Sequence, residues 1–356
     1  MYGLDLLRIL SMIGIIGLHI MNNGGMLAAA NTIPKLLMIR IAAVICYSSV
    51  NIFAMMTGYL YVQRKTVSSA NLINLIFTVG FYCIVILAGF VVVKPEVFDG
   101  FRGLYIHALF PPLVGRYWYI TSYVLLFAMI PYLNALIHSL HAYQYRSMLW
   151  ILFIFLSVVS TFGLNDYFKI DNGYSPFWLM FCYMVGGYIK LYEEHLFHGN
   201  LAKWIAIIVV NILLVIDLWY ILGDSVISTT FLIRNYISPF IVAEAAMLLL
   251  VFSKITIRSE TLKRIVLSLS NSSFGVYTLH SHILIFDYVL AGAFLWTSES
   301  GAPAFLCTLI VSPVLIYCVC WVADILRSHF FQWVRIDKFA NLIGAGMDRL
   351  VGWTQE

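Results

Sequence analysis

Apolar stretches of about 20 residues follow one another along almost the whole chain. A helix needs about 20 mostly apolar residues to cross the hydrocarbon core of a bilayer. Ten segments meet this requirement: 4–22, 36–62, 71–93, 117–137, 147–163, 175–192, 202–222, 231–253, 273–296 and 302–326. Because backbone polar groups in lipid must be paired internally, we expect an all-α integral membrane protein, a polytopic bundle of about ten transmembrane helices. Pro131, Pro239 and Pro313 are expected to kink their helices.

The composition excludes a water-soluble domain of this length. Of the 356 residues, 62% are hydrophobic and 11% are charged, whereas a soluble domain is roughly one quarter charged. Most of the outer surface must therefore face membrane lipids. The net charge of +4 is small and gives no reason to expect a nucleic-acid partner. All six cysteines lie in apolar stretches without metal-ligand spacing, so we expect them to pack as small apolar residues and expect no metal.

The distribution of Lys and Arg predicts the orientation. If the N-terminus is cytoplasmic, the inner side carries twice as many Lys and Arg as the outer side, so both termini are placed in the cytoplasm. Residues 1–328 form the predicted transmembrane domain. Residues 329–356 are predicted to be a cytoplasmic amphipathic tail, because 330–335 mixes aromatic and basic residues as an interfacial helix does.

The first span carries the most informative pair of ionisable residues, Arg8 and His19. They are 11 residues apart, which on an α-helix is close to three turns, so they share a face and lie about 16 Å apart along the axis. Such residues within a span are costly unless they face a partner or water. In one interpretation, Arg8 reaches the inner interface and pairs with Asp5, while His19 makes a hydrogen bond between helices. In the other, both residues line a functional site.

Further polar side chains lie in or at the ends of spans: Asn51, Arg116, Asp217, Glu244, Tyr277, His280 and Asp287. Tyr277 and His280 are three residues apart and share a helix face. The segment 116–119 (RYWY) is either an aromatic belt at the membrane interface or a binding surface. Together these residues indicate a polar interior, which a pore or an active site would require. The roles of Asp217, Glu244 and Asp287 stay open.

Four motifs in order resemble one family of membrane enzymes. Residues 4–8 (LDLLR) with His19 match an Arg-x10-His pattern, and 50–60 (VNIFAMMTGYL) matches a second-span motif. Residues 116–119 (RYWY) with 131–134 (PYLN) and 272–280 (SSFGVYTLH) match two later motifs. The chain thus resembles the membrane acyltransferase-3 family, which includes O-acyltransferases of bacterial surface polysaccharides and peptidoglycan. It departs at Thr57, where the family usually has serine, and at 63–65 (QRK), which replaces an Arg-x-x-Arg cluster.

The resemblance implies a function in a bacterial plasma membrane. The protein would move an acyl group, by expectation acetyl, from cytoplasmic acyl-CoA to a hydroxyl of a cell-surface polysaccharide or another envelope glycan. Acyl-CoA, as acetyl-CoA, would be the donor substrate.

The resemblance also implies roles for particular residues. Arg8 and His19 would be catalytic, with His19 as general base towards the acceptor hydroxyl or, alternatively, as the carrier of an acyl-histidine intermediate. Donor binding would involve Arg8, Arg64, Lys65, Tyr277 and His280. Acceptor binding would involve Asn51, Arg116, Trp118 and Tyr119.

A secondary transporter or a flippase for an envelope precursor is the alternative, because it too would need buried polar residues along a path. The chain has no internal repeat and no pair of broken helices in corresponding halves, which counts against a transporter. A polysaccharide polymerase would need a large outer loop, and only 94–116 is available.

Overall fold

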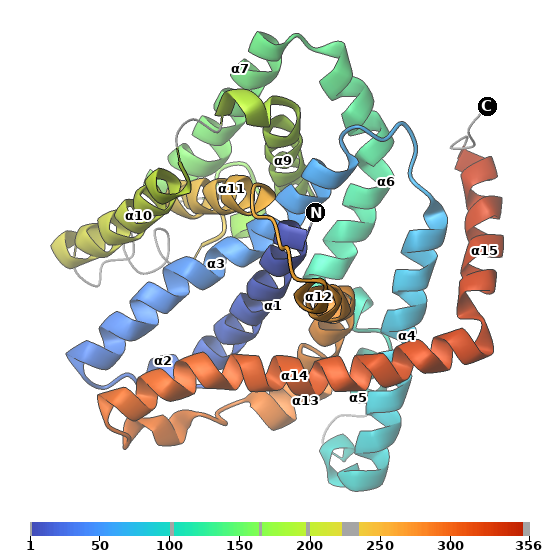
Figure 1. The fold of residues 1–356 in the computed structure, drawn as a ribbon. Coiled ribbons are helices and arrows are strands. Elements are labelled where there is room, and N and C mark those ends of the chain that lie inside the picture. The colour runs from blue at the N-terminus through green and yellow to red at the C-terminus, as the bar shows by residue number, and fades with distance from the viewer. Residues whose placement is uncertain (1, 100–102, 164–165, 197–199, 223–234, 352–356) are drawn as a thin grey trace.

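The computed structural model describes residues 2–99, 103–163, 166–196, 200–222 and 235–351, and over these ranges the chain forms helices and no strand (Figure 1). The α-helices are α1 (Tyr2–Asn22), α2 (Met26–Ala29), α3 (Ile33–Tyr61), α4 (Ser69–Val93), α5 (Leu104–Leu109), α6 (Trp118–Ser139), α7 (Ala142–Leu152), α8 (Ser160–Phe162), α9 (Pro176–Leu196), α10 (Leu201–Leu222), α11 (Pro239–Ser253), α12 (Glu260–His280), α13 (Ile283–Ile285), α14 (Ala302–Val334) and α15 (Ile336–Val351). A π-helical stretch, Phe153–Val159, joins α7 to α8.

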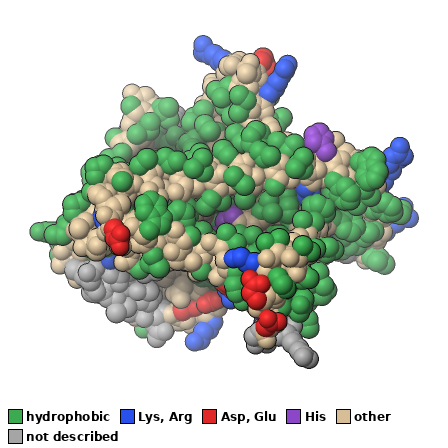
Figure 2. Space-filling view, turned by 90° about the horizontal axis from the view of Figure 1, so that it is seen from below, with side chains coloured by type: hydrophobic (Ala, Val, Ile, Leu, Met, Phe, Trp, Pro, Cys, Tyr) green, Lys and Arg blue, Asp and Glu red, His purple; other side chains and the backbone are tan. Residues whose placement is uncertain are grey.

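Seven helical segments in the described ranges are long and apolar enough to cross a membrane: α1, α3, α4, α6, the stretch Ala142–Phe162, α10 and α14. Large apolar side chains on α4, α10 and α14 are exposed, and Figure 2 shows apolar side chains covering most of one face. Such a surface suits lipid and not water. The prediction of an all-α membrane bundle is confirmed, while the number of ten spans and the cytoplasmic termini stay predictions.

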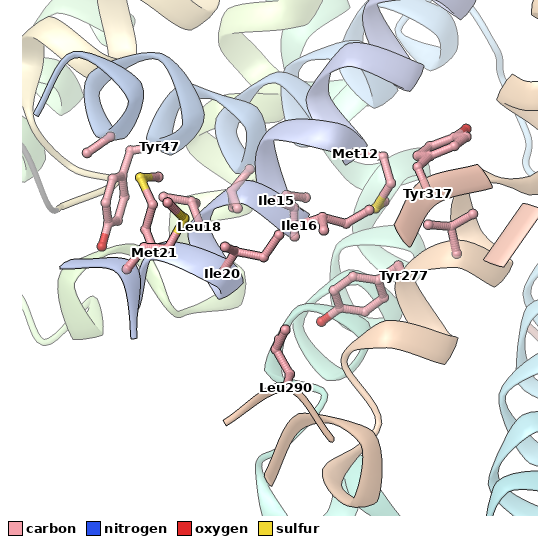
Figure 3. Close-up of a cluster of buried hydrophobic side chains, with 14 of the residues drawn as sticks. Met12, Ile15, Ile16, Leu18, Ile20, Met21, Tyr47, Tyr277, Leu290 and Tyr317 are labelled. Carbon is pink, nitrogen blue, oxygen red and sulfur yellow. The ribbon is translucent and has the colours of Figure 1, made fainter. Parts of the chain in front are cut away.

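Helix α1 lies in the interior of the bundle, where it contacts α3, α11, α12 and α14. Met12, Ile15 and Ile16 belong to one of the hydrophobic cores, together with Tyr47 of α3 and Tyr277 of α12 (Figure 3). A helix that is apolar on nearly all sides is expected to be surrounded by protein or lipid. Because protein surrounds α1, a polar side chain on it points into the molecule.

Helices α3 and α9 pack closely through glycines. A Cβ atom at Gly58 would overlap the backbone carbonyl of Tyr183, and one at Gly186 would overlap the carbonyl of Met55. Small residues at such a crossing let two backbones approach closely within a membrane. Gly58, which belongs to the second-span motif, therefore has a packing role.

We expect Gly58→Ala to cost about 1–3 kcal/mol of stability, because the added methyl group must displace the backbone of α9. Thermal unfolding of the detergent-purified protein would show a melting temperature lowered by several degrees. Gly80→Ala is the matched control, since nothing lies within 4 Å of a Cβ there and alanine is the better helix former. Equal melting temperatures for both variants would contradict the close packing of α3 and α9.

The predicted span 273–296 is wrong. Helix α12 begins earlier, at Glu260, and ends at His280; the short α13 and a π-helical stretch, Phe286–Leu290, follow. His282 causes the break by capping α13: its Nδ1 accepts the Leu284 N–H at 3.3 Å. A side chain that accepts from the first turn of a helix stabilises the start of a new helix there. The apolar residues after His282 concealed this break in the sequence.

The expected kink at Pro239 is also wrong, because this residue begins α11. Proline suits the first turn of a helix, where its missing N–H has no partner to lose. The described part of the predicted span 231–253 is thus a shorter helix, and 231–234 lies outside the described residues. Pro131 and Pro313 do lie inside helices, α6 and α14.

The C-terminal region continues the bundle. Helix α14 extends to Val334, past the predicted domain boundary at 328, and Arg335 turns the chain with φ 61°. Helix α15 then runs beside α4 (Figure 1), where Asp348 accepts the backbone N–H of Ser69 at 3.0 Å. The segment predicted as an amphipathic tail therefore lies partly in α14 and partly in a helix packed against α4.

Candidate active site

A cavity of about 470 Å³ lies between α1, α3, α6 and α12. This volume is in the range of small-molecule sites. Its lining is mostly apolar and aromatic, with a few polar side chains: Arg8, Met12, Ile15, His19, Val50, Phe53, Met56, Thr57, Leu60, Tyr61, Arg64, Leu75, Trp118, Tyr119, Ile120, Tyr123, Tyr236, Ser270, Asn271, Ser273, Phe274 and Tyr277. The cavity includes both ionisable residues of the shared α1 face, and Met12 and Ile15 between them.

At one end of the cavity, Arg8 is held by a small polar network. Its Nη1 donates to Asp5 Oδ1 at 3.0 Å and to Ser270 Oγ at 2.8 Å, and the Ser270 hydroxyl donates to the same Asp5 oxygen at 3.0 Å. Both sequence interpretations of Arg8 thus hold in part, since it pairs with Asp5 and also lines the cavity. A guanidinium has five N–H donors, so Arg8 keeps donors for an anion in the cavity.

Arg64 adds a second positive charge to the lining. Its guanidinium lies over the ring of Tyr61, 4.3 Å from the ring centroid. This contact orients the arginine beside the end of α3. Lys65 is exposed next to it but does not line the cavity. Of the three cations predicted to bind the donor, two therefore reach the cavity.

His19 lies three helical turns from Arg8 and packs between two rings. Its ring centroid is 5.0 Å from that of His280 and 5.0 Å from that of Phe286, which stands almost perpendicular to it. Within the described part of the chain, its Nδ1 is buried and has no hydrogen-bond partner. A histidine that only joined two helices would be expected to pair its buried nitrogen. This geometry favours the interpretation that His19 belongs to a functional site.

Tyr277 and His280 differ in position although they share a face of α12. Tyr277 lines the cavity, whereas His280 lies behind His19, is 3% exposed and is not part of the lining. The Nδ1 atom of His280 is 2.6 Å from the carbonyl oxygen of Val276. Only Tyr277 of this pair is therefore in position to contact a molecule in the cavity.

The aromatic side chains of Trp118, Tyr119 and Tyr236 form another part of the wall, and Tyr174 packs against this part without lining the cavity. Trp118 packs against Tyr174 at 4.6 Å and Tyr236 at 5.9 Å between ring centroids, and Tyr174 lies 4.9 Å from Tyr236. Tyr119 follows on α6; among the described residues its hydroxyl has no hydrogen-bond partner and is buried. The wall thus offers flat rings and one unpaired O–H donor. Trp118 and Tyr119 were predicted from the sequence, whereas Tyr174 and Tyr236 were not.

Two other residues predicted to bind the acceptor do not line the cavity. Asn51 is fully buried; its amide donates to the Tyr236 carbonyl at 2.8 Å and accepts from Trp178 Nε1 at 2.9 Å. Asn51 thus joins α3, α9 and the segment before α11, which is a structural role. Arg116 pairs with Asp287 at 3.0 Å on an exposed surface.

The remaining polar residues of the spans also lie away from the cavity. Glu244 is 1% exposed within α11, and its Oε2 has no partner in the described part of the chain. Asp217 is exposed on α10. Ser270 and Tyr123, by contrast, line the cavity although no sequence motif pointed to them. A serine in an apolar helix is too common to indicate a site.

The fold and the cavity define a multi-pass membrane protein with an internal cavity lined by two arginines and a histidine. The model of a family described as an acyltransferase domain matches residues 1–323, so the chain belongs to the acyltransferase-3 family and is a membrane acyltransferase. This confirms the family assignment made from the motifs. The match ends within α14 and leaves α15 outside. No curated protein and no solved structure matches the chain.

Proposed function

We propose that the protein transfers an acyl group, specifically acetyl, from cytoplasmic acyl-CoA to a hydroxyl of an envelope glycan on the outer side of a bacterial plasma membrane. The main support is that one cavity contains both Arg8 and His19, on the same face of α1. A transferase that accepts its donor on one side and its acceptor on the other needs such a connection. A secondary transporter or flippase remains the alternative class.

The donor end is the end at Arg8 and Arg64. CoA carries several phosphate charges, and an arginine fork binds phosphate with two parallel hydrogen bonds. Arg8 is already oriented by Asp5 and Ser270, so it loses less side-chain freedom when phosphate binds. The pantetheine arm would then extend along Met12 and Ile15, which separate the charged end from His19 in the lining.

The chemical step takes place at His19. As a general base, its ring removes the proton of the acceptor hydroxyl as the hydroxyl oxygen attacks the thioester carbon. The C–S bond then breaks, and the proton passes from the imidazolium to the thiolate of CoA. We assign the unpaired Tyr119 hydroxyl to the acyl carbonyl oxygen, because a buried donor in a mostly apolar cavity stabilises the charge that develops on that oxygen.

The acceptor end is the aromatic wall. The apolar faces of sugar rings stack on flat aromatic side chains, and Trp118 lies with Tyr174 and Tyr236 beside the cavity. We therefore assign Trp118 to acceptor binding. Arg116 is close in sequence but is paired with Asp287, so we give it no direct contact.

The experiment that tests the proposed function uses purified full-length protein and radiolabelled acetyl-CoA. We expect saturable binding and slow hydrolysis of acetyl-CoA without an acceptor, and faster release of CoA when envelope glycan fragments are added. A transporter or a flippase would show neither hydrolysis nor transfer. Analysis of the envelope glycans of a strain lacking the protein would identify the acceptor.

Trp118→Ala should raise the apparent KM for the glycan acceptor about tenfold, corresponding to about 1.4 kcal/mol of lost stacking. The Kd for acetyl-CoA should change little. Trp118→Phe should recover most of the affinity because it keeps a flat ring. Trp150→Ala is the control, since Trp150 is 58% exposed on α7 and distant in sequence from the wall. Equal losses of donor and acceptor affinity in Trp118→Ala would instead indicate a structural role.

A further inference from the structure

Two neighbouring histidine rings each carry a buried nitrogen without a hydrogen-bond partner in the described part of the chain. Among the described residues, His19 Nδ1 and His280 Nε2 are buried and make no hydrogen bond, and the two ring centroids are 5.0 Å apart. Buried polar atoms are usually paired, because an unpaired one costs about 1–3 kcal/mol. Two such atoms on adjacent rings therefore need a common explanation.

The hydrogen bond of His280 to the backbone determines which of its nitrogens carries the proton. The Val276 carbonyl can only accept, so Nδ1 of His280, 2.6 Å away, must be the N–H donor. In the neutral ring, Nε2 then carries a lone pair and can only accept. The bond to Val276 thus fixes the imidazole of His280 with Nε2 as its free hydrogen-bond acceptor.

The surrounding chain keeps His280 in this place. Helix α12 ends at His280. Both ring nitrogens of the next histidine, His282, have partners: Nε2 is 2.9 Å from the Ala108 carbonyl oxygen, and Nδ1 accepts from the Leu284 N–H. Phe286 returns against His19 at 5.0 Å, almost perpendicular to its ring. The break after His280 therefore places one ring behind His19 and another beside it.

We infer that His280 is a positioning residue for His19. Its Nε2 accepts the Nδ1–H of His19, directly after a small rotation of the His19 ring or through one water. Hydrogen bonds of this kind are often long before substrate binds and tighten in the reacting complex. This bond selects the His19 tautomer whose Nε2 carries the lone pair, which leaves that atom as the base in the cavity. The inference rests on the proposed function of His19.

The hydrogen bond between His19 Nδ1–H and His280 Nε2 persists throughout the reaction. The proton from the acceptor hydroxyl is taken up at Nε2 of His19 and later leaves from Nε2 to the CoA thiolate. The Nδ1–H bond of His19 stays intact, and His280 stabilises the imidazolium as its neutral acceptor. An orienting acceptor of this kind sets the tautomer of a catalytic histidine without itself touching the substrate.

The test compares three substitutions of His280 in the full-length purified protein. In His280→Gln, the amide oxygen can take the place of Nε2 and accept from His19, but the bond to Val276 is lost. In His280→Asn, the amide can take the place of Nδ1 and keep the bond to Val276, but nothing reaches His19. His280→Ala removes both bonds. Gln and Asn both fill most of the volume of the buried His280 side chain. The comparison of these two variants therefore decides between a positioning role and a structural role.

We expect kcat for acetyl transfer to fall about 100-fold in His280→Ala, as when a general base is misoriented, with the KM for acetyl-CoA within about twofold of wild type. His280→Gln should recover most of the kcat, and His280→Asn should not, whichever of the two has the higher melting temperature. Recovery by Asn and not by Gln would overturn the inference and leave a purely structural role. So would a wild-type kcat in His280→Ala.

The outcome separates this inference from the proposed function. If wild-type protein neither binds nor turns over acetyl-CoA, the proposed function fails. If wild type transfers acetyl and His19→Ala does not, while all three His280 variants match wild type, only the positioning role fails.

Discussion

His19→Ala is expected to lose about 10²–10⁴-fold in the kcat for acetyl transfer, the range for removal of a general base. The Kd for acetyl-CoA should stay within about twofold of wild type, because Arg8 lies three helical turns from His19 on α1 and Arg64 follows the end of α3. Loss of an interaction that is made only in the transition state lowers kcat and leaves ground-state binding unchanged. Stopped assays of CoA release and equilibrium binding of labelled acetyl-CoA would measure the two quantities.

The control for His19 is another histidine of the same chain. His329 is exposed on α14, and His329→Ala should keep both kcat and Kd. His19→Gln tests the chemistry further, because an amide fills the space between Phe286 and His280 but cannot take up a proton near neutral pH. It should be as inactive as His19→Ala. Transfer at a near wild-type rate by a folded His19→Ala protein would end the assignment of His19 as base.

The relation between Arg8 and His19 could be predicted from the sequence because it depends on one helix. Eleven residues on an α-helix are close to three turns, and α1 is helical from Tyr2 to Asn22. Helical periodicity alone therefore placed both side chains on one face. What they face depends on other helices, and only the structure brings Ser270 to Arg8 and His280 to His19.

The sequence could not separate a polar residue that faces the cavity from one that joins helices. Asn51 and Trp118 both carry polar groups within or at the end of an apolar span. The Asn51 amide is occupied by hydrogen bonds with Tyr236 and Trp178, whereas Trp118 lines the cavity. The direction of each side chain depends on the rotation of its helix within the bundle. Hydropathy determines that a segment crosses the membrane and contains little information on this rotation.

The end of α12 shows a second limit of prediction from the sequence. Apolar residues continue beyond His280, so a window of hydropathy extends the span to 296, whereas the chain turns at 281–282. The turn depends on capping by His282 and its bond to the Ala108 carbonyl, 174 residues away in sequence. A contact this distant cannot be inferred from local pattern, yet it places His280 behind His19.

Arg8→Ala should show the opposite kinetic pattern to His19→Ala. Loss of a charge-assisted hydrogen bond to phosphate costs about 1.5–3 kcal/mol, which corresponds to about a 10–100-fold rise in the Kd and KM for acetyl-CoA. The kcat at saturating donor should change little, since phosphate contacts are made equally in the ground state and the transition state. The same binding and CoA-release assays on detergent-purified protein would measure the effect.

Substitutions around Arg8 distinguish phosphate binding from simple charge. Arg8→Lys should recover only part of the affinity, because an ammonium is a point charge without the two-pronged fork. Arg258→Ala removes one exposed cation just before α12 that does not line the cavity, and it should leave the Kd nearly unchanged. Acetyl-dephospho-CoA lacks one phosphate of the donor, and acetyl-pantetheine lacks all of them. If each loss weakens binding to wild type and to Arg8→Ala equally, Arg8 does not contact phosphate. A larger penalty in wild type than in Arg8→Ala identifies the phosphate that Arg8 binds, because two groups in contact have non-additive effects.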